Sequence, residues 1–355
     1  MSFSGLDRAM MARALALAER GLYTTTPNPR VGCVIAQANR IVGEGWHERT
    51  GAPHAEANAL VAAGAAARGA TAYVTLEPCN HHGRTPPCAE ALARAGIARV
   101  VVAARDPSPG AAGGGQTLRA AGVRVEFGLL EEAARELNLG FFSRMTRGRP
   151  WVRMKVATTL DGRSALADGT SRWISGAEAR RDGHRWRARA CAILTGIGTV
   201  IADDPQLTVR AVETPRQPLR VVVDSRLEIP DSARILQGDP VLVFAAQHSR
   251  AVPNAEVVVL PNAHGKVDLG AMLAELARRG VNELHVEAGA RLNGSLVREG
   301  CVDEFLVYLN PSFLGEGAQP IVALAAPVSL DARPRLRIHS VERVGEDLRL
   351  LARPT

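Results

Sequence analysis

The sequence predicts an α/β protein made of two domains. Its 355 residues are enough for two hydrophobic cores. Apolar runs of strand length alternate with longer helical runs in both halves. Residues 144–150 read Arg-Met-Thr-Arg-Gly-Arg-Pro, a polar stretch that interrupts this alternation. We therefore expect one domain in residues 1–146 and another in residues 150–355, with no internal repeat relating them.

The first half predicts a helix, a hairpin and then alternating helices and strands. The amino-terminal helix has apolar residues at helical spacing, namely Met10, Ala14, Leu17 and Ala18. An Ala-rich helix should run from His54 to about residue 68, where Gly69 ends it. Another helix should begin at Cys88, directly after Pro87. Strands are expected at 31–35 and 40–46, joined by a turn near Asn39, and at 72–76, 99–103 and 123–127.

The second half predicts a larger set of strands with helices between them. The strands are expected at 151–157, 191–195, 219–224, 240–245, 256–260, 283–286 and 303–309, and the helices at 177–189, 269–279 and 292–299. Gly196 and Gly198 follow a strand, as in a dinucleotide-binding turn. Ile201 is too large for the third glycine of that fingerprint, so this motif alone is weak.

Composition excludes several classes of protein. The net charge is +7, but the arginines are dispersed and only 4 Trp, 3 Tyr and 7 Phe are present, so we expect no nucleic-acid partner. No apolar run approaches the roughly 18 to 20 residues of a membrane span. The amino terminus lacks a signal-peptide pattern. Five cysteines, two of them in a metal motif, fit a reduced cytoplasm best.

Four residues of the first half carry a recognisable chemistry: His54, Glu56, Cys79 and Cys88. One imidazole and two thiolates suit zinc, and three protein ligands leave a fourth position open for water. Glu56 follows His54 by two residues, so it can reach that water without being a ligand. His54 and Cys88 are both predicted at helix starts, where backbone donors favour a thiolate. This arrangement resembles that of the zinc-dependent base deaminases.

Other interpretations of these residues remain open. A closed structural zinc site would need a fourth ligand, which His81 or His82 could supply, but Glu56 would then have no purpose. A non-enzymatic zinc scaffold would need the same fourth ligand. Cys33 lies in an alternating strand and is expected in the core.

Longer motifs in both halves resemble the bifunctional deaminase/reductase family of bacterial riboflavin biosynthesis. The first half carries the eight-residue spacing between Cys79 and Cys88 together with residues 27–33, 44–47 and 106–109. In the second half the matching motifs are residues 160–163, 171–175, 202–210 and 286–289. The resemblance extends from about residue 5 to about residue 350, in order along the chain.

The resemblance implies a cytidine-deaminase-like α/β/α domain followed by a dihydrofolate-reductase-like α/β domain. The first would bind zinc through His54, Cys79 and Cys88, and would use Glu56 to remove the 2-amino group of a phosphorylated diamino-ribosylamino-pyrimidinone. The second would use NADPH to reduce the ribosyl group to ribityl. We also expect a homo-oligomer formed through the reductase domain.

Individual residues follow from the same resemblance. Asn28 and His47 are expected in the deaminase pocket. Cofactor contacts are expected at Ala157, Trp173, Thr199, Asp203, Ser225, Gly289, Ala290, Arg291, Leu292, Asn293, Gly294 and Ser295. Substrate contacts in the reductase are expected at Lys155, Ser171, Arg187, Leu207, Arg210 and Glu287. Arg226, next to Ser225, is our own candidate for the 2′-phosphate of NADPH.

Several of these residues also have structural interpretations. Asn28 and His47 could belong to a turn and a solvated loop, and Asp203 could cap a turn. Lys155 could be an edge or snorkelling lysine, and Arg187 could belong to a solvated helix face. Glu287 ends an apolar strand, where a buried carboxylate needs a partner, so a ligand hydroxyl or amine is expected beside it.

Two features set limits on the resemblance. Residues 110–115 read Gly-Ala-Ala-Gly-Gly-Gly where a valine and a basic residue are expected, so we expect a mobile loop there. A deaminase acting on RNA or single strands is the rival function. It would require an aromatic groove and a clustered basic face, and neither is visible in the sequence.

Overall fold

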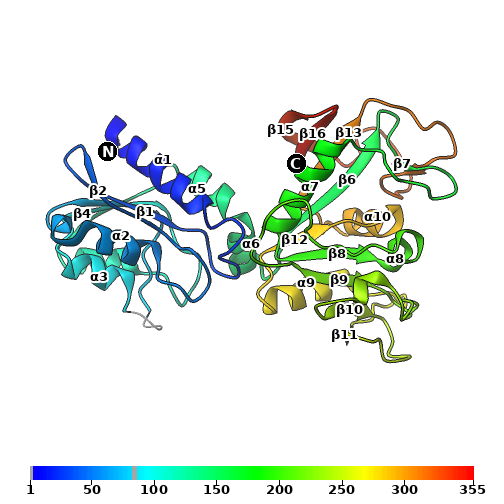
Figure 1. Ribbon diagram of the computed structural model, residues 1–355, viewed down its shortest axis with the longest axis horizontal. Helices are drawn as coiled ribbons and strands as arrows, with labels where there is room; N and C mark the ends of the chain where they lie inside the picture. Colours follow the sequence, from blue (N-terminus) through cyan, green and yellow to red (C-terminus); the bar gives the residue numbers. More distant parts are fainter. Residues whose placement is uncertain (1–2, 82–85) are drawn as a thin grey trace. The chain divides into compact units, whose positions relative to one another are not determined.

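The computed structural model describes residues 3–81 and 86–355, and it divides into two compact units between Gly148 and Arg149 (Figure 1). Both units are mixed α/β structures, which confirms the predicted fold class. Among the described residues, no helix combines the length and the apolarity needed to cross a bilayer. All five cysteines are free thiols.

The amino-terminal unit is built on a five-stranded sheet in the order β2-β1-β3-β4-β5. β1 pairs antiparallel with β2 and β3, whereas β3, β4 and β5 are parallel. The strands are β1 (Gly32–Gln37), β2 (Arg40–Trp46), β3 (Thr71–Leu76), β4 (Arg99–Ala104) and β5 (Arg124–Phe127). The helices are α1 (Gly5–Glu19), α2 (Ala55–Ala63), α3 (Cys88–Arg94), α4 (Gly114–Ala120), α5 (Glu131–Leu137) and α6 (Leu139–Arg147), with a 3₁₀ turn over Gly64–Ala67.

Helices cover both faces of this sheet, so the unit has three layers (Figure 1). On one face, α2, α3 and α4 bury Ala59, Leu92 and Leu118 against the strands. On the other face, α1, α5 and α6 bury Met11, Ala134 and Phe142. Cys33 belongs to the first of these cores and is fully buried, as its strand position predicted.

Glycines in β2 allow α2 to lie directly on the sheet. A Cβ atom on Gly43 would lie 2.3 Å from the Ala59 carbonyl oxygen, and one on Gly45 would lie 2.4 Å from that of Ala55. The helix contributes small residues to the same contact, because Ala55, Ala59 and Ala63 recur at every fourth position. This close packing fixes the start of α2, where His54 lies.

The sequence prediction differed from this unit in two ways. The α-helix after His54 ends at Ala63 rather than near residue 68, because Gly64 begins a 3₁₀ turn. The prediction also missed α4, α5 and α6. α6 extends through residues 144–147, which were taken as a polar linker; its arginines belong to a helix whose other side buries Phe141 and Phe142.

The carboxy-terminal unit is built on a nine-stranded sheet in the order β11-β10-β9-β8-β12-β6-β13-β16-β15. Its strands are β6 (Trp151–Thr159), β8 (Ala192–Gly196), β9 (Leu219–Val223), β10 (Val241–Ala245), β11 (Ala255–Val259), β12 (Glu283–Val286), β13 (Glu304–Asn310), β15 (Leu336–Val344) and β16 (Asp347–Pro354). The helices are α7 (Ala177–Arg189), α8 (Ile197–Asp203), α9 (Leu269–Arg278) and α10 (Ala290–Arg298), with a 3₁₀ turn over Arg234–Leu236. Two short strands, β7 (Arg163–Ala165) and β14 (Gln319–Pro320), pair separately.

The strand order reverses direction between β8 and β12. From β8 the chain continues outward through β9, β10 and β11, whereas β12, β6 and β13 lie on the other side. These strands are parallel. α8 begins directly after β8, and α10 begins after the three residues that follow β12. Ligands of open α/β sheets bind at the carboxyl ends of the strands beside such a reversal.

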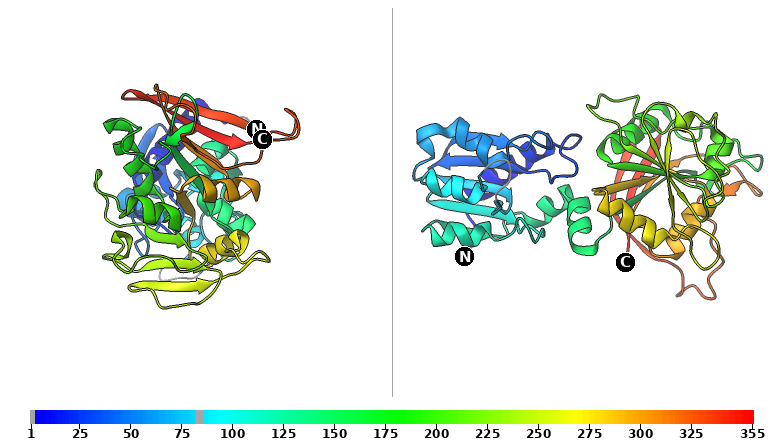
Figure 2. Two further views of the ribbon diagram at one scale, coloured as in Figure 1. Left: turned by 90° about the vertical axis from the view of Figure 1, so that its right-hand side faces the viewer. Right: turned by 90° about the horizontal axis from the view of Figure 1, so that it is seen from below.

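The carboxy-terminal hairpin was missed by the sequence prediction. β15 and β16, red in Figure 2, pair antiparallel and end the sheet. An irregularity between Ile338 and Ser340 shifts the register, which disrupts the alternation that would have identified the strand. Ile338 and Val341 remain more than half exposed.

A buried ion network connects the middle strands of this sheet. Arg153 of β6 donates to Glu283 of β12, at 2.9 Å, and to Glu304 of β13. Arg189 also donates to Glu283, at 2.7 Å, and Arg353 donates to Glu304, at 2.9 Å. The side chain of Arg153 is 2% exposed, so its charge depends on these partners rather than on water.

Arg153→Met should lower the free energy of unfolding by about 3 to 5 kcal/mol, because it removes a charged partner from each of two buried carboxylates. Urea denaturation of the full-length protein measures this loss. The matched control is Arg278→Met, whose side chain is 72% exposed and pairs within one helical turn; we expect a change within about 0.5 kcal/mol. Equal stability of Arg153→Met and the wild type would contradict the role given to the network.

Candidate active sites

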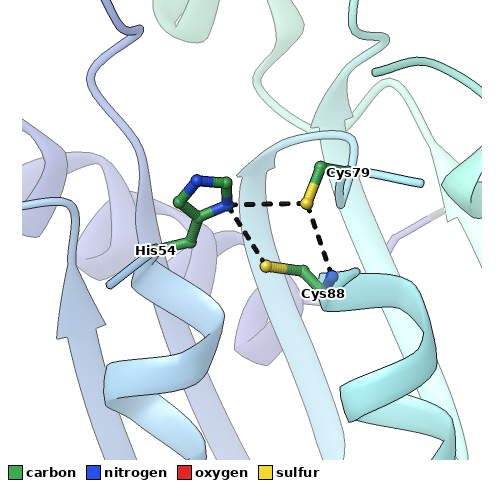
Figure 3. Close-up of side chains that lie close together, drawn as sticks. All are labelled: His54, Cys79 and Cys88. Carbon is green, nitrogen blue, oxygen red and sulfur yellow. Dashed lines mark hydrogen bonds between the residues drawn. The ribbon is translucent and has the colours of Figure 1, made fainter. Parts of the chain in front are cut away.

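The three predicted metal ligands meet at one point of the amino-terminal unit (Figure 3). His54 is the residue that precedes α2, and Cys88 is the first residue of α3. Cys79 lies three residues after the end of β3, in a segment without regular structure. Two helix starts and one strand end therefore deliver the three side chains.

The ligand atoms face one another closely. His54 Nδ1 lies 3.5 Å from Cys79 Sγ and 3.4 Å from Cys88 Sγ, as Figure 3 shows. The Cys88 backbone N–H donates to Cys79 Sγ at 3.4 Å. All three ligand atoms lie within 4.8 Å of one another. One nitrogen and two sulfur donors at this spacing fit a zinc ion, with Nδ1 as the ligand atom of the histidine.

Hydrogen bonds decide which donor of the cluster loses its proton, and the hydrogen bond with Cys79 raises the pKa of the Cys88 thiol. Hydrogen bonds from Cys88 and His54 lower the pKa of the Cys79 thiol, so that this sulfur is readily a thiolate. The hydrogen bond to Cys79 in turn raises the pKa of His54. A metal ion replaces the shared protons by binding the same three atoms.

Glu56 lies beside the metal ligands in the first turn of α2 and is 3% exposed. Burial raises its pKa to about 7. A carboxyl group with a pKa near neutrality can both accept and release a proton in the same reaction, as a general acid/base must.

Among residues 3–81 and 86–355, only His54, Cys79 and Cys88 form a group of three or more residues that could hold a metal. His81, one alternative fourth ligand, has an exposed side chain outside this group. His82, the other alternative, lies outside the described residues. The described part of the chain thus offers three donors, which is the number typical of a catalytic zinc site.

Asn28 and His47 lie next to this cluster. The His47 ring packs edge-on against the His54 ring, with centroids 5.5 Å apart. His47 Nδ1 lies 3.1 Å from the Pro53 carbonyl oxygen, which can only accept, so the proton is on Nδ1. His47 Nε2 therefore accepts from the Asn28 amide, at 3.1 Å. The buried His47 is thus not a residue of a solvated loop.

A cleft of about 2050 Å³ occupies the carboxyl ends of the central strands in the second unit. Its lining includes nearly all residues predicted for the reductase: Ala157, Trp173, Thr199, Asp203, Ser225, Gly289, Ala290, Arg291, Leu292, Asn293, Ser295, Lys155, Ser171, Arg187, Leu207, Arg210 and Glu287. Gly294 is the exception. It faces Ala323, because a Cβ atom there would lie 2.2 Å from the Ala323 carbonyl oxygen.

Lys155, Arg187 and Glu287 form the charged centre of the cleft. Arg187 donates two hydrogen bonds to the Glu287 carboxylate, of 2.5 Å and 2.9 Å. The sequence led us to expect a ligand beside this carboxylate, but its partner is an arginine of the protein itself. Burial alone would raise the pKa of Glu287, but Arg187 lowers it well below its usual range. Burial lowers the pKa of Lys155. Lys155 lies on β6, between β12 and β13, so it is not on an edge strand.

Sequence reasoning missed His184, which lines the same cleft. Its Nδ1 accepts from the Arg210 backbone N–H at 3.2 Å. Burial and the charges of Arg187 and Arg210 lower its pKa to about 4, so it is neutral near pH 7. The available signal was its position three residues before Arg187, on the same side of α7.

Three further residues sit at the rim of the cleft. Trp173 is 70% exposed, and the Arg180 guanidinium lies over its ring at 4.6 Å. Arg226 is also exposed, with Glu228 as a distant partner at 3.7 Å. Ser225 accepts a hydrogen bond from the Val267 backbone N–H at 3.3 Å.

Two protein-family models match the chain. Residues 4–104 match the zinc-binding region of cytidine and deoxycytidylate deaminases, and residues 150–350 match the RibD carboxy-terminal domain. The riboflavin biosynthesis protein RibD of Escherichia coli K12 is 45% identical over 358 residues, which cover 96% of this chain and 98% of that protein. RibD of Haemophilus influenzae is 43% identical and covers 100% of this chain and 99% of its own length.

Solved structures agree with these sequence matches. The structure of Acinetobacter baumannii RibD is 43% identical, with a TM-score of 0.92 and 99% of each chain covered. The structure of a diaminohydroxyphosphoribosylaminopyrimidine deaminase/5-amino-6-(5-phosphoribosylamino)uracil reductase from Thermotoga maritima is 33% identical, with a TM-score of 0.91 and 99% of each chain covered.

Cys88→Ser should abolish most zinc binding, because a serine hydroxyl stays protonated where the thiol becomes a thiolate ligand. Metal analysis of the purified variant measures the loss against about one zinc per wild-type chain. Cys301→Ser is the matched control, since Cys301 is a buried cysteine of the other unit. Full zinc retention in Cys88→Ser would remove this residue from the ligand set.

Proposed function

This chain belongs to the RibD family, whose members join a deaminase and a reductase in riboflavin biosynthesis, and on that premise we propose the following division of labour. Residues 1–146 hydrolyse the 2-amino group of 2,5-diamino-6-ribosylamino-4(3H)-pyrimidinone 5′-phosphate. Residues 150–355 then reduce the ribosyl group with NADPH and give 5-amino-6-(5-phosphoribitylamino)uracil. The observation that carries the first assignment is the convergence of His54, Cys79 and Cys88 beside a buried Glu56.

His54, Cys79 and Cys88 fit a zinc ion, which supplies an activated water molecule near neutral pH when it is bound. Glu56 then accepts the proton of the attacking water. It gives this proton to the ring nitrogen. It then takes the second proton from the hydroxyl that was added to the carbon and gives it to the departing amino group, which leaves as ammonia, so that the carboxyl group ends the reaction as it began. Asn28 and His47 border the same cluster and are placed to contact the pyrimidine.

The amino end of α10 supports NADPH as the cofactor of the second unit, because it can bind a phosphate group. No side chain caps this helix, so the backbone N–H groups of its first turn are available to a phosphate. The N-cap residue is Gly289, which has no side chain, so a ligand can come close to the backbone there. Arg226 and Lys266 line the same cleft and offer positive charge for a 2′-phosphate.

Substrate would lie on the charged centre of the cleft. Arg187 is committed to Glu287, so the forked guanidinium of the exposed Arg210 is the better candidate for the ribose 5′-phosphate. Lys155 faces the same cleft with a lowered pKa, which suits a group that donates a proton to the reduced sugar. The Glu287 carboxylate can accept from ribosyl hydroxyls while Arg187 keeps it ionised.

We also propose a homo-oligomer and a cytoplasmic location, each supported by one observation. The exposed apolar residues of the carboxy-terminal hairpin, Leu336, Ile338, Val341 and Leu348, support a homo-oligomer formed through the reductase unit. The free thiols of all five cysteines, with no disulfide among the described residues, support a reduced cytoplasm.

Glu56→Gln should retain zinc and lose most deaminase turnover, because an amide cannot accept the proton of water. Release of ammonia from the pyrimidinone phosphate measures the loss. The same preparation should still reduce the deaminated ribosyl compound with NADPH, since that site lies in the other unit. A Glu56→Gln protein with wild-type deaminase turnover would exclude this mechanism.

Arg210→Lys should weaken binding of the deaminated ribosyl phosphate by about 1.5 to 3 kcal/mol, because a lysine replaces a forked pair of charged hydrogen bonds by a single point charge. NADPH affinity should stay at the wild-type value. Two titrations, one with each ligand, separate these effects. Arg216→Lys is the control, since Arg216 contacts backbone carbonyls outside the cleft. Loss of NADPH binding with unchanged substrate affinity would move Arg210 to the cofactor site.

A further inference from the structure

Cys79 is the metal ligand with the least support from regular structure. His54 is fixed by α2, which packs closely on β2, and Cys88 is fixed as the first residue of α3. Cys79 lies three residues after the end of β3 and belongs to neither a helix nor a strand. Its sulfur must nevertheless stay within a few tenths of an ångström of its place to bind a metal. Another part of the chain has to hold it.

The segment of residues 110–117, here called the glycine-rich segment, packs against this stretch from outside. A Cβ atom on Gly114 would lie 1.8 Å from the Pro78 carbonyl oxygen and 2.9 Å from its carbon. No side chain fits there without moving the backbone that precedes Cys79. Gly110, in contrast, has nothing within 4 Å of an added Cβ. Glycine is thus required at position 114 but not at position 110. Gly115 also excludes a side chain, but the close contact there is with the Phe127 ring, at 2.6 Å.

Hydrogen bonds join the same two segments on both sides of Cys79. Before it, Glu77 Oε1 accepts from the Gly115 backbone N–H at 3.0 Å. After it, the Asn80 backbone N–H donates to the Ala111 carbonyl oxygen, also at 3.0 Å. The Thr117 hydroxyl donates to Asn80 Oδ1 at 2.8 Å. The segment that was expected to be mobile therefore has defined contacts with Glu77, Pro78 and Asn80.

We propose that the glycine-rich segment positions the metal ligand Cys79 and thereby sets the zinc affinity of the site. Gly114 leaves room for the Pro78 carbonyl group, and Ala111 and Thr117 form hydrogen bonds with Asn80. This inference rests on the proposed function, in which Cys79 binds zinc. None of these residues belongs to the candidate group of metal ligands. They act by fixing the backbone on which the ligand is carried, as outer-shell partners of metal sites do.

The test is a chelator competition that measures zinc affinity in the full-length protein. Gly114→Ala should bind zinc about tenfold to about a hundredfold more weakly, the usual effect of losing an outer-shell partner. Gly110→Ala should match the wild type, because its added methyl group meets nothing. The absorption spectrum of the cobalt-substituted protein reports the geometry directly, and it should change in Gly114→Ala and not in Gly110→Ala.

A second pair of variants keeps the test decisive if Gly114→Ala fails to fold. Thr117→Val removes the hydroxyl that holds Asn80 and keeps the shape of the side chain, whereas Thr117→Ser keeps the hydroxyl. Thr117→Val should weaken zinc binding, and Thr117→Ser should restore it to the wild-type value. NADPH-dependent reductase turnover of the same chains should be equal throughout, which shows that the second unit is intact.

The outcomes separate the inference from the function on which it rests. Wild-type zinc affinity and an unchanged cobalt spectrum in a folded Gly114→Ala protein, or equal affinity in Thr117→Val and Thr117→Ser, would overturn the positioning role while leaving the zinc site in place. A wild-type protein that binds no zinc would overturn the proposed deaminase site, and the positioning role with it.

Discussion

The contact between the His54 imidazole and the thiols of Cys79 and Cys88 is the constraint on which the amino-terminal unit depends. One ring nitrogen within 3.5 Å of two sulfurs requires three separate segments to end at one point. Small residues make this possible: Gly43 and Gly45 bring α2 onto β2, and Gly114 leaves room for the Pro78 carbonyl. A glycine buries no side chain, so core packing alone does not account for these three residues. They are explained by the close approach of the segments that carry the metal ligands.

In the second unit, charged side chains from separate segments meet in the cleft. Its strands deliver Lys155 and Glu287 to the reversal point of the sheet, and α7 adds Arg187. The Arg187–Glu287 pair keeps the carboxylate ionised, and burial lowers the pKa of Lys155. Near the amino ends of the strands β6, β12 and β13, the Arg153 network pairs charges that do not line the cleft. The amino-terminal unit thus places its reactive groups where a strand ends and helices begin. In the second unit only Glu287 follows the end of a strand, whereas Lys155 lies within β6 and Arg187 lies in the last turn of α7.

The sequence was informative wherever residues close in the chain act together. His54 and Glu56 are two residues apart, and the strands of both sheets have local apolar patterns, so these features could be predicted. Contacts between distant residues could not. Arg187 and Glu287 are 100 residues apart, so the sequence suggested a ligand as the partner of each. The glycine-rich segment appeared mobile because its contact with Pro78 depends on tertiary packing. β15 was missed because a bulge breaks its alternation. The residues assigned to substrate and cofactor stay predictions.

X-ray absorption at the zinc K-edge of the purified full-length protein distinguishes an open three-ligand zinc site from a closed four-ligand one. We expect a four-coordinate ion with two sulfur neighbours at about 2.3 Å and two nitrogen or oxygen neighbours at about 2.0 to 2.1 Å, one of them exchangeable water. Adding a small anion that binds zinc should change the nitrogen and oxygen shell and leave the two sulfurs in place. A shell of three or more sulfurs, or one that no added anion alters, would contradict the open site formed by His54, Cys79 and Cys88.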